Sequence, residues 1–236
     1  MDRSAPDSLT DAQVQSFFDR ANGLGDVGAT VDLYRDWAAV YDATIERFGR
    51  YLSPDRIAET VVRRCPDPSV PILDVACGTG LVGQALARRG YDRITGLDLS
   101  EPMLEVARGK GCYAALIAAD LEGPMPVGPF SVVVCAGALT LGHQGAAAFE
   151  VMAGLLAAGG VIIVDVEGGI FRTQGFAALL ERLQSDRVLT GFELDEGHFY
   201  QSPATEPAHG YFLTAWRDWA PGPDAEDLHL VKGSRG

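Results

Sequence analysis

The architecture of this chain follows from one stretch, Pro71-Ile-Leu-Asp-Val-Ala-Cys-Gly-Thr-Gly-Leu-Val-Gly83. Its apolar first half is broken only by Asp74, and its glycine-rich turn leads into a helical pattern that ends at Gly90. A strand, a tight loop and a helix in this order form half of a nucleotide-binding unit. Gly78 and Gly80 lack a Cβ, so the loop can adopt positive φ and approach a ligand closely. The free N–H groups that begin the helix favour anionic or electron-rich ligand groups.

Strand and helix patterns alternate along the rest of the chain. Besides the strand in the opening stretch, we expect strands at 93–97, 113–118, 130–135 and 161–166. We expect helices from Ser53, from Leu81 and from Ser100, and over 145–158 and 173–184. This alternation predicts an α/β fold with a parallel, doubly wound sheet. Two further strand candidates, 192–195 and 210–217, are expected to form a hairpin-like pair at the end of that sheet.

Length and charge restrict the class of protein. The 236 residues suffice for one α/β domain with decorations, and the net charge of −13 repels phosphate backbones and anionic lipid, which disfavours nucleic acid as a partner. The four cysteines occur singly, without metal-ligand spacing, which is typical of small buried side chains in a reducing cytoplasm. Because no signal-peptide pattern and no apolar run of about 20 residues occurs, we expect a cytoplasmic protein without a membrane span.

The residues before the first core strand form two helical patterns. Thr10 and Gln13 have the spacing of a capping box and begin the first pattern. The second pattern carries Tyr34, Trp37 and Tyr41 at helical spacing, after a glycine-rich segment. These aromatic side chains form either one packed helix face or a lid over a cofactor, with the phenol groups supplying hydrogen bonds.

The glycine loop is compatible with two kinds of cofactor. Gly78-x-Gly80-x-x-Gly83 followed by Asp98 satisfies the dinucleotide fingerprint. Asp74, however, lies inside the strand before the loop, where it would repel a pyrophosphate and attract an ammonium group. Asp120 follows the third strand, where it can accept a hydrogen bond from an adenine amino group. A nicotinamide-dependent oxidoreductase of this size would also need a Tyr-x-x-x-Lys motif or a separate substrate domain, so S-adenosylmethionine is favoured.

Together these motifs resemble those of class I S-adenosylmethionine-dependent methyltransferases. The segments are D-V-A-C-G-T-G at 74–80, G-L-D-L-S at 96–100 and A-A-D-L at 118–121, with the lead-in Y-x-x-W-A-x-x-Y-D at 34–42. The resemblance is closest to the Williams–Beuren-region methyltransferase-like group. It implies a mostly parallel seven-stranded Rossmann-like sheet with an N-terminal helical lid. The expected divisions are a lid segment at 1–52, a methyltransferase domain at 53–220 and a polar tail at 221–236.

The resemblance also implies roles for individual residues. Asp74 would hold the methionine amino group, and Asp98 would accept both ribose hydroxyls. The remaining expected cofactor contacts are the backbone of Ala76, Gly78 and Gly80, adenine packing by Leu99 and Met103, adenine-edge contacts by Asp120 and Leu121, the lid residues Tyr34, Trp37 and Tyr41, and Ala136 after the fourth strand. Ala76 stands where many members have glycine. Met103 and Leu121 are equally compatible with core packing.

The expected reaction is methyl transfer to a small-molecule acceptor. A sulfonium is an activated donor, so the protein mainly aligns the acceptor and excludes water. The segment 136–143 is where family members place substrate-facing residues, and it lacks the Asn-Pro-Pro-Tyr type of motif, which disfavours DNA-adenine and glutamine methylation. His143 is the titratable group in this segment that suits a base near neutral pH, although such a histidine is also often structural.

Aromatic side chains near the end of the chain bear on the acceptor. Phe199 and Tyr200 are expected to contribute to an aromatic cover, which favours a small, partly apolar acceptor. The rival function is a non-catalytic module that binds S-adenosylmethionine for regulation. The sequence predicts no metal site and leaves the oligomeric state open.

Overall fold

The computed structural model describes residues 10–22, 27–121, 123, 128–140, 145–201 and 209–218. Its main sheet has seven strands in the order β4-β3-β2-β5-β6-β9-β7. All neighbours pair in parallel except β9, which runs antiparallel to both β6 and β7. The bounds are β2 (Ile72–Val75), β3 (Ile94–Asp98), β4 (Ala115–Ala118), β5 (Phe130–Leu139), β6 (Leu156–Glu167), β7 (Gly191–His198) and β9 (His209–Trp216). This confirms the predicted doubly wound, mostly parallel seven-stranded sheet and its terminal antiparallel pair.

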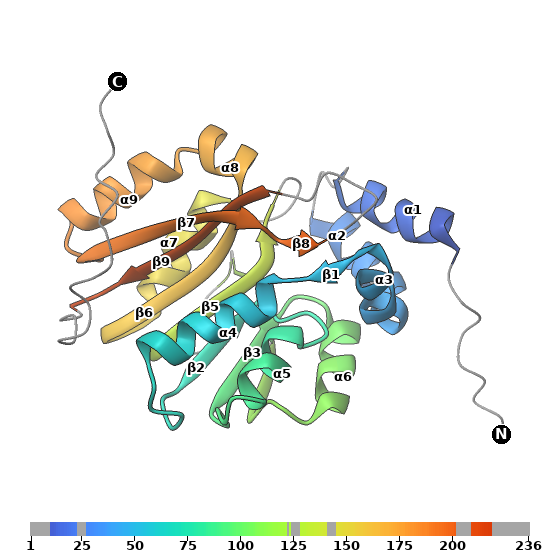
Figure 1. Ribbon diagram of the computed structural model, residues 1–236, viewed down its shortest axis with the longest axis horizontal. Helices are drawn as coiled ribbons and strands as arrows, with labels where there is room; N and C mark the ends of the chain where they lie inside the picture. Colours follow the sequence, from blue (N-terminus) through green and yellow to red (C-terminus); the bar gives the residue numbers. More distant parts are fainter. Residues whose placement is uncertain are drawn as a thin grey trace.

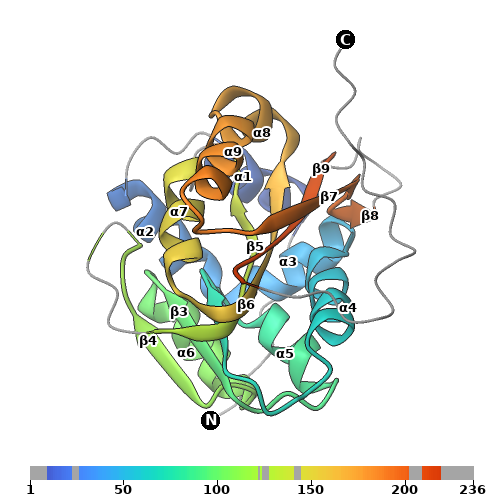
Figure 2. The same cartoon turned by 90° about the vertical axis from the view of Figure 1, so that its left-hand side faces the viewer.

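Helices cover both faces of the sheet, with α4 and α5 on one side and α7 and α9 on the other (Figure 2). From Ser53 onward, the helices are α4 (Ser53–Arg64), α5 (Leu81–Ala87), α6 (Glu101–Lys110), α7 (Ala146–Gly154), α8 (Gly168–Thr173) and α9 (Phe176–Ser185). Among the described helices, none has both the length and the apolar character needed to cross a bilayer.

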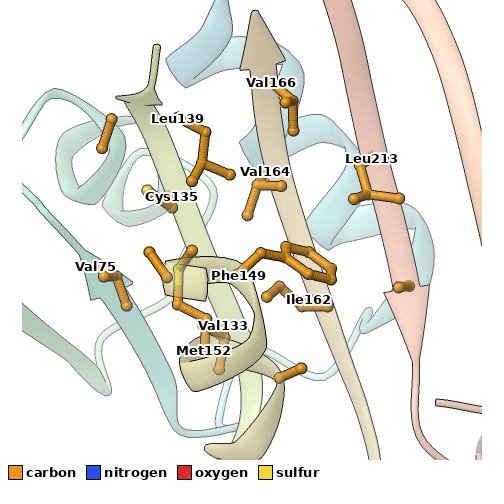
Figure 3. Packing of buried hydrophobic residues seen from close by; sticks show 14 of the residues in the cluster. Val75, Val133, Cys135, Leu139, Phe149, Met152, Ile162, Val164, Val166 and Leu213 are labelled. Atoms are coloured by element: carbon orange, nitrogen blue, oxygen red, sulfur yellow. The ribbon is translucent and has the colours of Figure 1, made fainter. Parts of the chain in front are cut away.

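The strands supply two cores because successive side chains point to opposite faces. In β2, Leu73 and Val75 pack with α7 and α9, whereas Ile72 packs with α4 and α5. Figure 3 shows Phe149 and Met152 of α7 lying against β5 and β6 on the first of these faces. The same alternation turns two carboxyl groups, Asp74 of β2 and Asp165 of β6, toward the face covered by α4 and α5.

The N-terminal elements gather at one end of the sheet, where α1 (Asp11–Asn22), α2 (Val27–Trp37) and α3 (Tyr41–Phe48) lie together (Figure 1). A 3₁₀ turn, Ala38–Val40, joins α2 to α3. The predicted capping box begins α1, since Gln13 Oε1 accepts from the Thr10 amide at 2.8 Å and Thr10 Oγ1 accepts from the Gln13 amide at 3.3 Å. A short antiparallel pair, β1 (Arg50–Tyr51) and β8 (Tyr200–Gln201), connects this end to the C-terminal part of the chain.

The structure corrects several of the predicted boundaries of helices and strands. The helix expected over 173–184 begins only at Phe176, because Gly175 adopts a left-handed conformation with φ of 72° at its N-cap, and Thr173 belongs to the separate short helix α8. The helix expected over 145–158 ends at Gly154, and β6 already begins at Leu156, which pairs with Phe130. Strand β5 continues four residues beyond its predicted end, to Leu139.

Two smaller expectations also need correction. Ser53 was expected to cap α4, but Leu52 occupies the N-cap position and Ser53 is the first helical residue, with a fully buried side chain. The four cysteines are unpaired, but only two of them are buried, Cys77 and Cys135, whereas Cys65 and Cys112 are partly exposed.

Candidate functional site

The carboxyl ends of β2, β3 and β5 meet at one edge of the sheet, and this brings the glycine loop next to Asp98. Asp98 Oδ2 accepts a hydrogen bond from the Gly78 amide at 2.8 Å, and Oδ1 accepts one from the Ser100 amide at 2.8 Å. Burial raises the pKa of Asp98, and these amides oppose the rise. Each carboxylate oxygen has a second acceptor site, so the group still fits two ligand hydroxyls.

The loop after β2 is strongly curved. Three of its residues have positive φ, namely Ala76 at 52°, Gly78 at 53° and Gly80 at 91°. The value at Ala76 explains why glycine suits this position, because a side chain in the left-handed region is strained. The positive φ expected at Gly78 and Gly80 is thus confirmed, and the role of the 76–80 backbone in lining a ligand stays a prediction.

Asp74 lies beneath the loop rather than at its surface. It is 1% exposed, and its Oδ2 accepts a hydrogen bond from the Tyr113 hydroxyl at 2.6 Å. Burial raises the pKa of Asp74 to about 7, against the lowering effect of Tyr113. Its Oδ1 has no hydrogen-bond partner in the described part of the chain. The predicted contact with an ammonium group therefore depends on this one oxygen.

The residues expected near adenine differ in exposure. Leu99 is 36% exposed beside Asp98, as a stacking surface requires, and Asp120 is half-buried after β4. The ends of β3 and β4 are held together by the Ala119 amide, which donates to the Asp98 carbonyl at 3.1 Å. Met103 and Leu121 are buried, at 1% and 7% exposure, as their core-packing alternative predicts.

The aromatic residues of the lead-in form one cluster. The ring of Trp37 stacks on Phe17 at 5.0 Å, lies 5.8 Å from Tyr34 and meets Tyr41 edge-on at 4.9 Å. The packed-face interpretation of these residues is therefore confirmed. Burial, and to a smaller extent the nearby Asp98 carboxylate, raises the pKa of both Tyr34 and Tyr41. Both phenols thus lie within electrostatic reach of the predicted ribose-binding acid, and the lid role stays a prediction.

One connection between the lead-in and the loop was not foreseen. Asp42 at the start of α3 accepts a hydrogen bond from the Thr79 hydroxyl at 2.6 Å and forms an ion pair with Lys110 at 2.6 Å. Lys110 ends α6, so three segments distant in sequence meet at this carboxylate. Asp42 and Thr79 both lie in recognisable motifs, the Y-D of the lead-in and the T of C-G-T-G, but neither motif indicates that the two side chains are in contact.

The predicted acceptor side is only partly described. His143 lies outside the described residues, and Ala136 is half-buried within β5. Phe199 was expected in an aromatic cover, but it is 3% exposed and packs edge-on against Phe212, so that expectation was wrong. Tyr200 does face the N-terminal elements, where its ring stacks on Tyr51 at 4.7 Å.

Asp165 is a buried carboxylate that the sequence interpretation missed. It is 1% exposed near the carboxyl end of β6, and its Oδ1 accepts a hydrogen bond from the Gly137 amide at 2.7 Å. The signal was available, because Asp165 interrupts an apolar strand as Asp74 does in β2. Asp74 was noticed only because a recognisable loop follows it.

Comparisons with known proteins agree with this geometry. The family described as "Methyltransferase domain" matches residues 72–160. Human methyltransferase-like protein 27 is 36% identical over 128 residues, which cover 52% of each chain. The ubiquinone biosynthesis O-methyltransferase of Xylella fastidiosa (strain 9a5c) is 33% identical over 121 residues and 48% of each chain. The chain thus matches about half the length of these curated relatives.

The fold has solved counterparts as well. Magnesium protoporphyrin IX methyltransferase from Synechocystis PCC 6803, solved with bound S-adenosylmethionine, superposes with a TM-score of 0.54 at 18% identity, over 92% of this chain and 100% of that one. This likeness concerns the fold, and the matched domain lies on the strands and loops that carry Asp74, Gly78 and Asp98. Residues 72–160 therefore match a methyltransferase domain, and the chain has the fold of a solved methyltransferase that binds S-adenosylmethionine.

Proposed function

We propose that this protein transfers a methyl group from S-adenosylmethionine to a small-molecule acceptor. The observation that carries the proposal is the clamp between Gly78 and Asp98, in which the loop amide holds the acid at the end of β3. The clamp places a carboxylate with acceptor capacity next to a loop whose backbone has no side chain at Gly78 and Gly80. Such an arrangement suits a ribose with its attached amino-acid chain.

Each of the proposed site residues contacts a different part of the cofactor. Asp98 accepts the ribose hydroxyls, Leu99 packs against adenine, and Asp120 with the Leu121 amide reads the adenine edge. Asp74 Oδ1 faces the methionine amino group from beneath the loop. Met103 is buried in the core and supports the residues that contact adenine.

The remaining parts prepare the acceptor. The bound cofactor supplies a methyl group that is already activated by the sulfonium, so the chain has to align an acceptor and exclude water. Tyr34, Trp37 and Tyr41 in the segment 1–52 close over the cofactor as a lid on the domain at 53–220. Ala136 lines the acceptor side, and His143 is the proposed base.

A small acceptor is supported by composition and by one relative. The net charge of −13 opposes binding of nucleic acid, and the aromatic rings of the lead-in are suited to a compact, partly apolar molecule. The matched relative from Xylella fastidiosa is named for ubiquinone biosynthesis. The four unpaired cysteines support a reducing compartment such as the cytoplasm.

The test begins with cofactor binding. Calorimetry should detect S-adenosylhomocysteine binding and no NADH binding to the purified protein. Asp98→Ala should weaken S-adenosylhomocysteine binding at least about tenfold, because hydrogen bonds to a charged group contribute about 1.5–3 kcal/mol each. The control is Asp92→Ala, which removes an exposed carboxylate just before β3, at the opposite end of the strand from Asp98.

Two results would contradict the proposal in different ways. Micromolar NADH binding without S-adenosylhomocysteine binding would favour an oxidoreductase. S-adenosylhomocysteine binding without any methylated product, when a metabolite pool is incubated with S-adenosylmethionine and analysed by mass spectrometry, would favour the non-catalytic regulatory module.

A further inference from the structure

Asp165 is a buried carboxylate with an unused oxygen. Its Oδ1 is engaged by the Gly137 amide, but its Oδ2 has no hydrogen-bond partner among the described residues. The Ser53 hydroxyl lies close enough to oppose the rise in the pKa of Asp165, yet Ser53 Oγ also completes no well-formed hydrogen bond. Burying such a group without partners is costly, so the arrangement points to a ligand group that supplies the missing donor.

Aromatic side chains lie near Asp165 on the side of the lead-in. Gly137 has φ of 74°, and a Cβ there would lie 2.7 Å from the Tyr51 hydroxyl oxygen, so Tyr51 lies directly over the backbone that holds Asp165. The Tyr51 ring stacks on Tyr200. The Asp165 carboxylate contributes to the raised pKa of Tyr51, Tyr200 and Tyr41, which places all three phenols within its electrostatic reach.

Tyr41 lies near both Asp165 and Asp98, the acid that is proposed to bind the cofactor ribose. Its pKa is raised by burial first, then by Asp42, Asp98 and Asp165. The phenol of Tyr41 therefore lies within electrostatic reach of both the proposed ribose-binding acid and Asp165. A ligand group at Asp165 would lie beside the cofactor on the side of β5 and β6, whereas Asp74 lies beneath the loop on Tyr113.

The negative charge of the Asp165 carboxylate is not balanced by a cation of the described residues. None of the described lysine or arginine side chains forms an ion pair with Asp165, and no cation contributes to its pKa. An unpaired buried carboxylate and several aromatic rings together favour a cation with N–H donors. An anionic group would be repelled, and a hydroxyl would leave the charge uncompensated.

We propose that Asp165 binds the protonated amino group of the acceptor, with Tyr51 and Tyr200 as the aromatic wall beside it. This inference rests on the proposed methyltransferase function and adds the class of acceptor, a small amine. Asp165 acts as a positioning residue that fixes the amine-bearing end of the acceptor next to the cofactor.

Three probes of similar size and different charge test the assignment: 2-phenylethylamine, 2-phenylethanol and phenylacetate. Each is titrated by ligand-observed NMR into the full chain saturated with S-adenosylhomocysteine. The amine should bind at least about tenfold more tightly than the acid, and more tightly than the alcohol, because only the amine forms a charge-assisted pair with a carboxylate.

A variant then locates the effect. Asp165→Asn keeps the side-chain oxygen for the Gly137 amide but removes the charge, and it should weaken amine binding at least about tenfold while the alcohol changes less than about threefold. Asp195→Asn in β7, which β9 separates from β6, is the matched control, because Asp195 is exposed. A purely structural Asp165 would change the three probes alike.

The outcomes separate the two proposals. Failure of S-adenosylhomocysteine to bind overturns the methyltransferase proposal and this inference with it. If S-adenosylhomocysteine binds, equal affinity for the three probes, no binding of the amine, or amine binding that Asp165→Asn leaves unchanged overturns the amine site alone. The ranking in the unsubstituted protein does not depend on whether a variant folds.

Discussion

Tyr113 explains three glycines that the fingerprint alone does not. A Cβ at Gly80, Gly83 or Gly96 would approach the Tyr113 ring within 3.0 Å. The ring therefore occupies space that these residues leave empty beneath the loop, and its hydroxyl holds Asp74. In this chain the third glycine of the motif makes room for a side chain that positions the buried acid.

The first prediction at this scale concerns Gly83→Ala. Because the new methyl group would overlap the Tyr113 ring, we expect the free energy of unfolding to fall by about 1–3 kcal/mol, a typical cost of overpacking. Cofactor affinity should fall too, since Tyr113 must move from Asp74. Denaturant unfolding and S-adenosylhomocysteine calorimetry measure the two effects.

Gly109→Ala is the control for this change. Gly109 lies in α6, and a Cβ there meets nothing within 4 Å. Alanine should stabilise that helix by about 0.5–1 kcal/mol. If Gly83→Ala were as stable as Gly109→Ala, the assigned position of Tyr113 would be wrong.

At the residue level, sequence reasoning succeeded where a motif fixes the spacing. Asp74, Gly78 and Asp98 were placed correctly because a strand, a turn and the next strand follow in order. Tyr113 was assigned to a strand, and its role stayed hidden because its partners are Asp74 and Gly83, far away in the sequence. Asp165 was missed for the same reason, since its environment comes from Tyr51 and Tyr200 across the fold.

Among the elements, α3 is the one that couples the lead-in to the glycine loop. Asp42 at its first turn engages both Thr79 in the loop and Lys110 at the end of α6. The lead-in is thus attached to the segment proposed to bind the cofactor, and not only to the aromatic cluster. Ordering of one should therefore follow ordering of the other.

The element-scale prediction uses this connection. Asp42→Ala should accelerate hydrogen exchange of the amides at 34–42 in the free protein and weaken S-adenosylhomocysteine binding by about tenfold, because a hydrogen bond and a partly buried ion pair are lost together. Addition of S-adenosylhomocysteine to the unsubstituted protein should slow exchange of the same amides.

Asp32→Ala provides the comparison, because within the described part of the chain Asp32 pairs with Arg35 of the same helix, on an exposed face. That variant should leave exchange at 34–42 and cofactor affinity nearly unchanged. Equal protection of these amides with and without S-adenosylhomocysteine would show that the lead-in is ordinary core packing and does not act as a lid.

Element boundaries were predicted correctly where the side-chain periodicity is strong. They were predicted wrongly where a glycine conformation or a strand pairing sets the end of a helix. Hydrophobic alternation located β2, β5 and the apolar part of β6. The left-handed conformation of Gly175 moved the start of one expected helix to Phe176, and pairing of Leu156 with Phe130 converted the end of another into strand. Neither effect is local enough to be visible in a short window of sequence.

For the molecule as a whole, two buried carboxyl groups make stability depend on pH. Burial raises the pKa of Asp74 to about 7 and that of Asp165 to about 6, above the ordinary value of 3.8. The folded chain therefore retains protons that the unfolded chain releases between about pH 4 and 7. The stabilisation is present at low pH and is lost as the pH rises through this window.

We therefore predict that Asp74→Asn combined with Asp165→Asn reduces the pH dependence. The free energy of unfolding should fall less between pH 5 and pH 7.5 in this variant than in the unsubstituted protein, by at least about 1 kcal/mol, since one pKa unit corresponds to about 1.4 kcal/mol. Urea unfolding at the two pH values gives the difference. Asp92→Asn combined with Asp195→Asn, both exposed, should reproduce the unsubstituted pH dependence. A double variant with undiminished pH dependence would contradict the assigned burial.

The order of strands has a consequence for synthesis on the ribosome. Strand β9 is the last described strand in the chain, yet it lies between β6 and β7 in the sheet. Until residues 209–216 have left the exit tunnel, β6 has an open edge from Val161 to Glu167, and β7 has no partner strand in the main sheet. The nascent chain thus carries an unpaired, largely apolar strand edge for the time needed to make about 50 further residues, about 2.5–10 s at typical synthesis rates. During that interval, protection of the β6 edge from other chains depends on the cell's chaperones.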